Sequence, residues 1–283
     1  MSDIFIKKHM SDVDVVRSAI VHAFGSNDIF ANYLVLKGGT LMHLRYGSSR
    51  YTTDIDYTCT WNEAPSRFEE ELLPQIDAQL RQSSIAIGAP DWEIRLQRIE
   101  RKPSKNDFDA MRFPALKLRF GYARRGSNEH RRLISKQCPT TIQVDISFRE
   151  VVYSGEHLHI ESIDQSVRSY SAQEVFAEKI RALIEQSIPG RGFTKERRQD
   201  IYDLNFFLEQ KFIRTEHREE VLSMIIQKCE LKGLSARREV FADPDFKLLC
   251  GKGWKTLHLE MSDLPEFDAC YQNVQRYFES LPW

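Results

Sequence analysis

The stretch from Lys37 to Tyr57, KGGTLMHLRYGSSRYTTDIDY, constrains the fold more than any other part of the sequence. Apolar residues 33–36 predict a short strand directly before it, and the two glycines end that strand. Thr40 can cap a following helix, and residues 54–61 show the pattern of a second strand. A strand, a glycine turn, a helix and another strand in this order predict an α/β fold.

The remaining pattern divides the chain near residue 165. Before residue 165 the pattern predicts helices over 11–24 and 63–82 and strands over 92–98, 115–122, 141–148 and 157–161. After it the pattern predicts helices only, over 171–187, 196–210, 214–229 and 264–280. We therefore expect an α/β (α+β) domain over residues 1–165, with a mixed sheet flanked by helices. An α-helical C-terminal domain is expected over residues 166–283.

The glycine turn has the features of a phosphate-binding loop. Gly38 and Gly39 would let backbone N–H groups approach a phosphate closely, because glycine has no side chain to block the approach. The helix that follows directs its positive N-terminal end to the same place, and Thr40 adds a hydroxyl group. The loop is therefore expected to bind the triphosphate of a nucleotide.

Three aspartates follow in positions that suit metal binding. Asp54 and Asp56 are two residues apart, so on a strand both point to one face, where a hard cation such as Mg²⁺ or Mn²⁺ would relieve their repulsion. In the alternating stretch Thr141–Phe148, Asp145 lies on the face opposite the apolar residues. Asp145 is thus the candidate third metal ligand, or the base that accepts the proton of an attacking hydroxyl. The alternative without a function is an aspartate that is simply exposed on a strand.

The helical half contributes an inward-facing lysine. Lys179 falls on the apolar side of its helix and needs an anionic partner, for which a triphosphate would serve. Asp200 and Asp203 fall on or beside the inner arc of the next helix. The pattern leaves two alternatives open, namely a salt bridge between the helices or one wall of an active site.

Composition limits the class of protein and its surroundings. The formal net charge is −1, so any contact with nucleic acid must come from local basic loops such as 101–109, 124–136 and 195–198. Basic loops of this kind are more often ordinary solvent-exposed surface. Five widely spaced cysteines without a CxxC argue against a disulfide framework and a zinc ribbon. No signal peptide or membrane-spanning run is present in the sequence, and we expect a cytoplasmic protein without membrane contact.

The motifs together resemble a known group of enzymes. Gly-Gly-Thr followed by Asp-x-Asp is similar to the signature of the DNA-polymerase-β-like nucleotidyltransferase superfamily, and KGGT…RYTTDID resembles its AbiEii/AbiGii toxin family. The block AEKIRAL at residues 177–183 and the block RQDIYDL at residues 198–204 are also similar to that family. One departure is Gln199, which stands where a common form of the second block has arginine, so either Arg197 or Arg198 could take that role.

The resemblance implies a metal-dependent enzyme that moves NMP from an NTP to an acceptor, with the helical domain closing the active-site cleft. It implies a toxin paired with an antitoxin and suggests tRNA or another RNA as the acceptor. Gly38, Gly39, Thr40 and Lys179 would bind the nucleotide, Asp54, Asp56 and Asp145 would hold the metals, and Asp200 or Asp203 would position Lys179. Two other functions stay open: modification of a protein or a small molecule such as an antibiotic, and NTP binding without catalysis.

Overall fold

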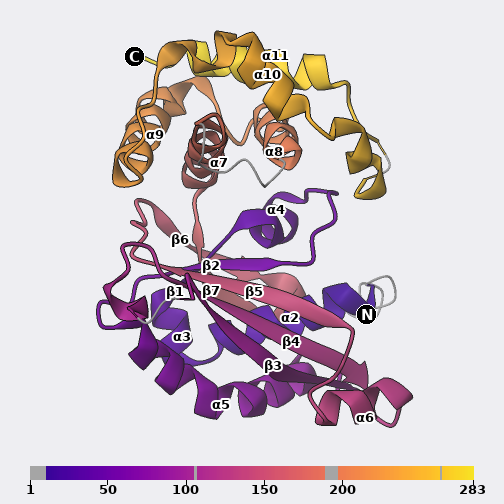
Figure 1. The fold of residues 1–283 in the computed structure, drawn as a ribbon. Helices are drawn as coiled ribbons and strands as arrows, with labels where there is room; N and C mark the ends of the chain where they lie inside the picture. The colour runs from indigo at the N-terminus through magenta and orange to yellow at the C-terminus, as the bar shows by residue number, and fades with distance from the viewer. Residues whose placement is uncertain (1–10, 105–106, 189–196, 262) are drawn as a thin grey trace. The chain divides into compact units, whose positions relative to one another are not determined.

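A computed structural model describes residues 11–104, 107–188, 197–261 and 263–283. The described chain forms two units (Figure 1). The α/β unit takes the residues up to Tyr46 and the segment Thr52–Ser169. The helical unit takes Tyr170–Trp283 together with the short segment Gly47–Tyr51, which lies between the glycine turn and the aspartate pair in the sequence. None of the helices formed by the described residues is long and apolar enough to cross a bilayer.

A seven-stranded mixed sheet is the centre of the α/β unit. Its strand order is β3-β4-β5-β2-β1-β7-β6. β2 is parallel to β5 and β1 is parallel to β7, whereas β1–β2, β3–β4 and β4–β5 are antiparallel. The strands are β1 Leu34–Lys37, β2 Ile55–Cys59, β3 Trp92–Lys102, β4 Ala115–Arg124, β5 Thr141–Phe148, β6 Gly155–Ile160 and β7 Gln165–Tyr170.

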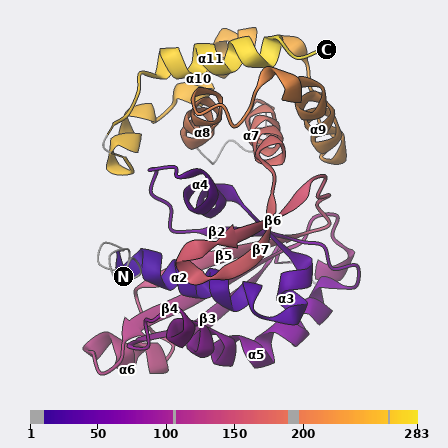
Figure 2. The same ribbon diagram turned by 180° about the vertical axis from the view of Figure 1, so that it is seen from behind.

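Helices cover the two faces of this sheet unequally. Both ribbon views place α2, α3 and α5 along one face and α4 on the other (Figures 1 and 2). These helices and the short α6 are α2 Asp12–Gly25, α3 Asp28–Tyr33, α4 Gly38–Tyr46, α5 Pro65–Ala86 and α6 Asn128–Ile134. Local signals set their starts: Ser11 forms a capping box with Asp14, and Pro65 occupies the first turn of α5.

The strand β5 shows how the sheet separates its core from its polar face. Ile142, Val144, Ile146 and Phe148 are at most 1% exposed. The alternating residues Gln143, Asp145 and Ser147 are half-buried on the other face. The predicted pattern of β5 is therefore confirmed, and the polar face is the one that carries the candidate carboxylates.

The helical unit contains five α-helices in its described part. They are α7 Ala172–Gln186, α8 Arg198–Glu209, α9 Arg218–Leu231, α10 Pro244–Gly251 and α11 Phe267–Glu279. Residues 171–174, Ser-Ala-Gln-Glu, have the sequence pattern of a capping box, which predicts that a helix starts here. Ser171 does cap α7, since its side chain accepts a hydrogen bond from the Glu174 N–H. Phe241, Tyr271 and Phe278 form a buried aromatic cluster between the last helices.

Three details of the sequence-based prediction need correction. Helix α4 begins at Gly38, so Thr40 lies inside its first turn and is not its cap. The basic stretch 124–136, expected as a loop, contains helix α6, which Ser127 caps. Strand β7 and helices α3 and α10 were not predicted. Of the basic loops, residues 105, 106, 195 and 196 lie outside the described residues.

Candidate functional site

The glycine turn and the aspartate pair meet across β1 and β2. Lys37, the last residue of β1, pairs in register with Asp56 of β2. Gly38 follows with φ +69°, and a Cβ built on it would overlap the Asp56 carboxylate oxygen and lie 2.9 Å from its Cγ. Glycine is required here for two reasons, because the backbone is left-handed and because the carboxylate occupies the place of a side chain. The predicted phosphate loop therefore lies directly against a predicted metal ligand.

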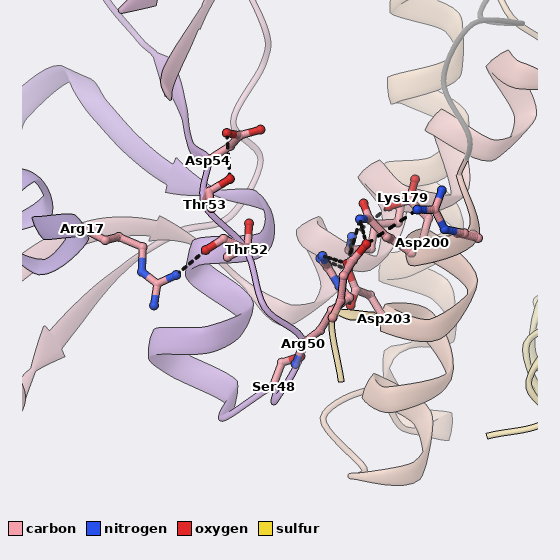
Figure 3. Close-up of polar contacts among 12 residues, drawn as sticks. Arg17, Ser48, Arg50, Thr52, Thr53, Asp54, Lys179, Asp200 and Asp203 are labelled. Atoms are coloured by element: carbon pink, nitrogen blue, oxygen red, sulfur yellow. Dashed lines mark hydrogen bonds and ion pairs between the residues drawn. The ribbon is translucent and has the colours of Figure 1, made fainter. Parts of the chain in front are cut away.

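Asp56 and Asp145 are neighbours across the sheet. Their strands are parallel, and the two residues are partners in register. Both side chains lie on the polar face and are half-buried. Asp54 directly precedes β2 and is exposed; the Thr53 hydroxyl donates to its carboxylate at 3.3 Å (Figure 3).

The segment that leads to Asp54 is fixed by two side chains. The Thr40 hydroxyl donates to the Asp54 carbonyl oxygen at 2.8 Å, so it ties the first turn of α4 to the start of β2. Arg17, a buried residue of α2, donates from Nη1 to the Thr52 carbonyl oxygen at 2.6 Å (Figure 3). Sequence reasoning missed Arg17, although a charged residue among the apolar positions of 11–24 is itself a signal of a buried polar role.

Asp145 has one oxygen available for a ligand. Its Oδ2 accepts a hydrogen bond from Gln143 Nε2 at 3.2 Å and lies 3.5 Å from Lys117 Nζ. Its Oδ1 is buried and has no hydrogen-bond partner among the described residues. A buried carboxylate oxygen without a partner is costly unless something binds it, so this atom fits a metal ion or an acceptor hydroxyl.

The carboxylates fit a divalent metal that shares its coordination with a substrate. Among the described residues, no group of three or more His, Cys, Asp and Glu side chains is gathered to hold a metal ion without help. Mg²⁺ commonly takes only one or two carboxylates and completes its octahedron with water and substrate phosphates. Asp56 and Asp145, adjacent on the sheet and beside the glycine turn, suit that kind of site.

A second ion pair on the same face was not predicted. Lys37 pairs with Glu150, and the Thr58 hydroxyl donates to Glu150 Oε2 at 3.1 Å. Lys37 belongs to the KGGT motif, whereas nothing in the sequence marks Glu150, which follows β5. The pair is mostly buried and holds the residue before the glycine turn to the segment after β5.

Within the helical unit, the three predicted residues form one buried charge network. Lys179 Nζ lies 2.9 Å from Asp200 Oδ1 and 2.7 Å from Asp203 Oδ2. Arg50, from the segment Gly47–Tyr51, donates to the two oxygens of Asp203 from Nε at 3.0 Å and Nη2 at 2.9 Å (Figure 3). Of the two alternatives that the sequence left open, the salt bridge is present in the structure.

The network keeps its groups charged despite burial. Burial alone would raise the pKa of Asp203, but the charges of Arg50 and Lys179 outweigh it and hold that pKa below its ordinary value. Burial would likewise lower the pKa of Lys179, but Asp200 and Asp203 outweigh it and raise that pKa. Arg50, Lys179 and Asp203 are therefore ionised together at neutral pH.

The arginines of the second helical block divide their contacts. Arg197 Nη1 lies 3.4 Å from Asp200 Oδ2, whereas Arg198 Nη2 lies 3.7 Å from Glu260 Oε1. Gln199, which departs from the family pattern, donates to both oxygens of Glu260 at 2.9 Å. Arg197 is thus the arginine that approaches the first aspartate of this block.

Two solved structures illustrate the similarity of the fold. MenT4, a nucleotidyltransferase toxin from Mycobacterium tuberculosis, matches with a TM-score of 0.57 and 14% identity, covering 98% of this chain and 88% of that one. JHP933 from Helicobacter pylori matches with a TM-score of 0.54 and 16% identity, covering 94% of this chain and 88% of that one. At these identities the likeness establishes the fold alone.

The family assignment comes from the sequence. No curated protein matches the chain. Residues 22–273, which include every candidate site residue in both units, match the family described as "Nucleotidyl transferase AbiEii toxin, Type IV TA system". Membership of this family implies a nucleotide substrate and a cognate antitoxin as partners. The chain belongs to the AbiEii family of nucleotidyltransferase toxins of type IV toxin–antitoxin systems.

Proposed function

We propose that this protein is a metal-dependent nucleotidyltransferase toxin that transfers NMP from an NTP to an RNA acceptor, with tRNA the first candidate. The observation that carries the proposal is the contact of Gly38 with Asp56, beside Asp145 Oδ1, which has no hydrogen-bond partner in the described part of the chain. A phosphate loop and two adjacent carboxylates are the parts that nucleotidyl transfer needs. We also propose a cytoplasmic location, which suits five buried, free cysteines.

The α/β unit supplies groups for each part of the reaction. The backbone N–H groups of Gly38 and Gly39 bind phosphate oxygens at the N-terminus of α4. Asp54, Asp56 and Asp145 hold Mg²⁺ or Mn²⁺, which when bound would promote the attack and stabilise the departing pyrophosphate. Thr40 contributes its backbone N–H, because its hydroxyl is bonded to the Asp54 carbonyl oxygen.

The bond changes follow from these positions. The acceptor hydroxyl oxygen attacks the α-phosphorus, and the bond from that phosphorus to the bridging oxygen of the β-phosphate breaks. Pyrophosphate leaves with the electron pair of that bond. Asp145 Oδ1, the oxygen without a partner among the described residues, either joins the metal site or accepts the hydroxyl proton as the base. When it binds the metal, the proton passes to water.

Lys179 has one N–H donor that its two carboxylate partners do not use. An ammonium group has three N–H donors, and Asp200 and Asp203 accept two of them. The described residues supply no third acceptor, so in this proposal the remaining donor is offered to a phosphate oxygen while the two carboxylates orient the ammonium group. Asp200 and Asp203 therefore act as positioning residues for Lys179 in this proposal.

A labelling assay tests the function. The purified protein would be incubated with each α-³²P-labelled NTP, Mg²⁺, total RNA and lysate protein, beside an Asp54→Ala/Asp56→Ala variant. We expect label from one NTP on an RNA band and none with the variant, because the variant lacks the carboxylate pair. Label on protein or on a small molecule would show that the acceptor is not RNA. NTP binding without turnover would show that the protein is not an enzyme.

A further inference from the structure

The polar face of β3 and β4 carries a row of cations beside Asp145. The side chains are Arg95, Arg98, Lys102, Lys117 and Arg119, and we call this set the basic face. Its location follows from β4, because Leu116, Leu118 and Phe120 are fully buried on the core side. The alternating residues Lys117 and Arg119 must therefore point to the face that carries Asp145.

A β-bulge aligns the β3 cations with those of β4. Before it, Arg95 pairs with Gly121; after it, Arg98 pairs with Arg119 and Glu100 with Lys117. The irregularity lies between Leu96 and Arg98, so Gln97 is the extra residue. If Gln97 were paired regularly, it would take the place opposite Arg119 and Arg98 would turn towards the core, so the bulge is what gathers the cations on one face.

The basic face has more positive than negative charge. Glu100 is shared by Arg98 at 3.0 Å, Lys102 at 3.2 Å and Arg119 at 3.6 Å. One carboxylate cannot neutralise three cations, and their side chains are 66%, 48% and 46% exposed. Arg95 pairs with Glu93. In a chain with a net charge of −1, this excess is a local feature that would attract an anionic partner.

Strand register connects the basic face with the carboxylates. Glu100 pairs with Lys117, Lys117 with Asp145, and Asp145 with Asp56, which gives one continuous row across four strands. Neighbouring strands lie about 4.8 Å apart, so this row spans about 15 Å. Arg119 and Arg98 lie two residues away from Lys117 and Glu100 on the same face of β4 and β3, and Arg119 is next to Gln143 of β5.

We propose that the basic face binds the phosphate backbone of the RNA acceptor and leads its hydroxyl end to Asp145. The inference rests on the proposed function and adds the surface that would recognise the acceptor. Guanidinium groups suit phosphates because they can donate two parallel hydrogen bonds. An extended row of exposed cations fits a polyanion, whereas a small acceptor would need only the site itself.

The test measures RNA binding directly, without nucleotide transfer. An Arg98→Gln/Arg119→Gln variant would be titrated against fluorescein-labelled total tRNA by fluorescence anisotropy across a salt series. We expect weaker binding and a salt-dependence slope smaller by about 2, that is about 1 for each lost phosphate contact. The KM for RNA should rise, whereas the affinity for NTP should stay unchanged, because neither arginine belongs to the nucleotide site.

The control makes the same change of charge on another surface. Arg67 and Arg81 are exposed residues of α5, which covers the opposite face of the sheet, and Arg67→Gln/Arg81→Gln should leave RNA binding as in the wild type. Unchanged RNA binding in the Arg98/Arg119 variant, or an equal loss in both variants, would overturn the proposal. Since anisotropy needs no turnover, a labelling assay without RNA product would refute the proposed acceptor separately.

Discussion

Replacing Asp203 by asparagine is expected to lower the free energy of unfolding of the helical unit by about 3 kcal/mol. Asp203 is fully buried and accepts hydrogen bonds from both Arg50 and Lys179. The asparagine amide removes the negative charge and turns an NH₂ group towards these cations. We expect the lower end of the range for broken buried pairs, because Asp200 still pairs with Lys179 and Glu260 still lies 3.4 Å from Arg50.

Hydrogen exchange of the α7 and α8 amides would measure this loss within the helical unit. The control is Glu216→Gln, which removes a carboxylate from an exposed pair with Arg214 in the same unit and should cost less than about 1 kcal/mol. Equal protection in the two variants would show that the buried network does not stabilise the unit.

The same network predicts a pH dependence. Because the pKa of Asp203 is lowered in the fold, its contribution to stability is complete above the unfolded value of about 3.9 and is lost as the pH falls through the folded value. Exchange at acidic pH should therefore bring the wild type closer to Asp203→Asn. A difference between them that stays constant through the acid range would contradict the ionised state of Asp203.

The parts of the fold that could be predicted are those with strong local signals. β5 was predicted with its observed bounds, because four apolar residues alternate with polar ones over Thr141–Phe148. The start of α7 was predicted from its cap at Ser171. β7 was missed because Gln165–Tyr170 has little apolar alternation; its pairing with β1, where Leu36 meets Ser169, is a contact between distant parts of the chain.

The candidate site divides in the same way. The proximity of Gly38 to Asp54 and Asp56 could be predicted because the three residues belong to one short sequence motif. Arg50 could not be assigned its partner, since Asp203 is 153 residues away and no periodicity connects the two. Lys117 was missed for a related reason, as its approach to Asp145 depends on the register of β4 and β5.

Replacing Gly38 by alanine is expected to reduce nucleotide transfer at least about 100-fold, because displacing a catalytic group by about 1 Å costs that much. The added Cβ would overlap the Asp56 carboxylate and lie 2.9 Å from its Cγ and 3.0 Å from its Cβ. Either Asp56 or the turn must move, and both carry the proposed site. Mn²⁺ titration by electron paramagnetic resonance would show the weakened metal site even where the acceptor is unidentified.

Gly47 provides a matched control for this prediction. It has the same φ of +69°, but a Cβ built on it meets nothing within 4 Å among the described residues. Gly47→Ala therefore carries the backbone strain of a left-handed alanine, about 1–2 kcal/mol, without the collision. Mn²⁺ affinity and transfer should fall in Gly38→Ala and stay near the wild-type values in Gly47→Ala. Equal losses in both would assign the effect to backbone strain, and the contact between the glycine turn and Asp56 would then have no special part in metal binding.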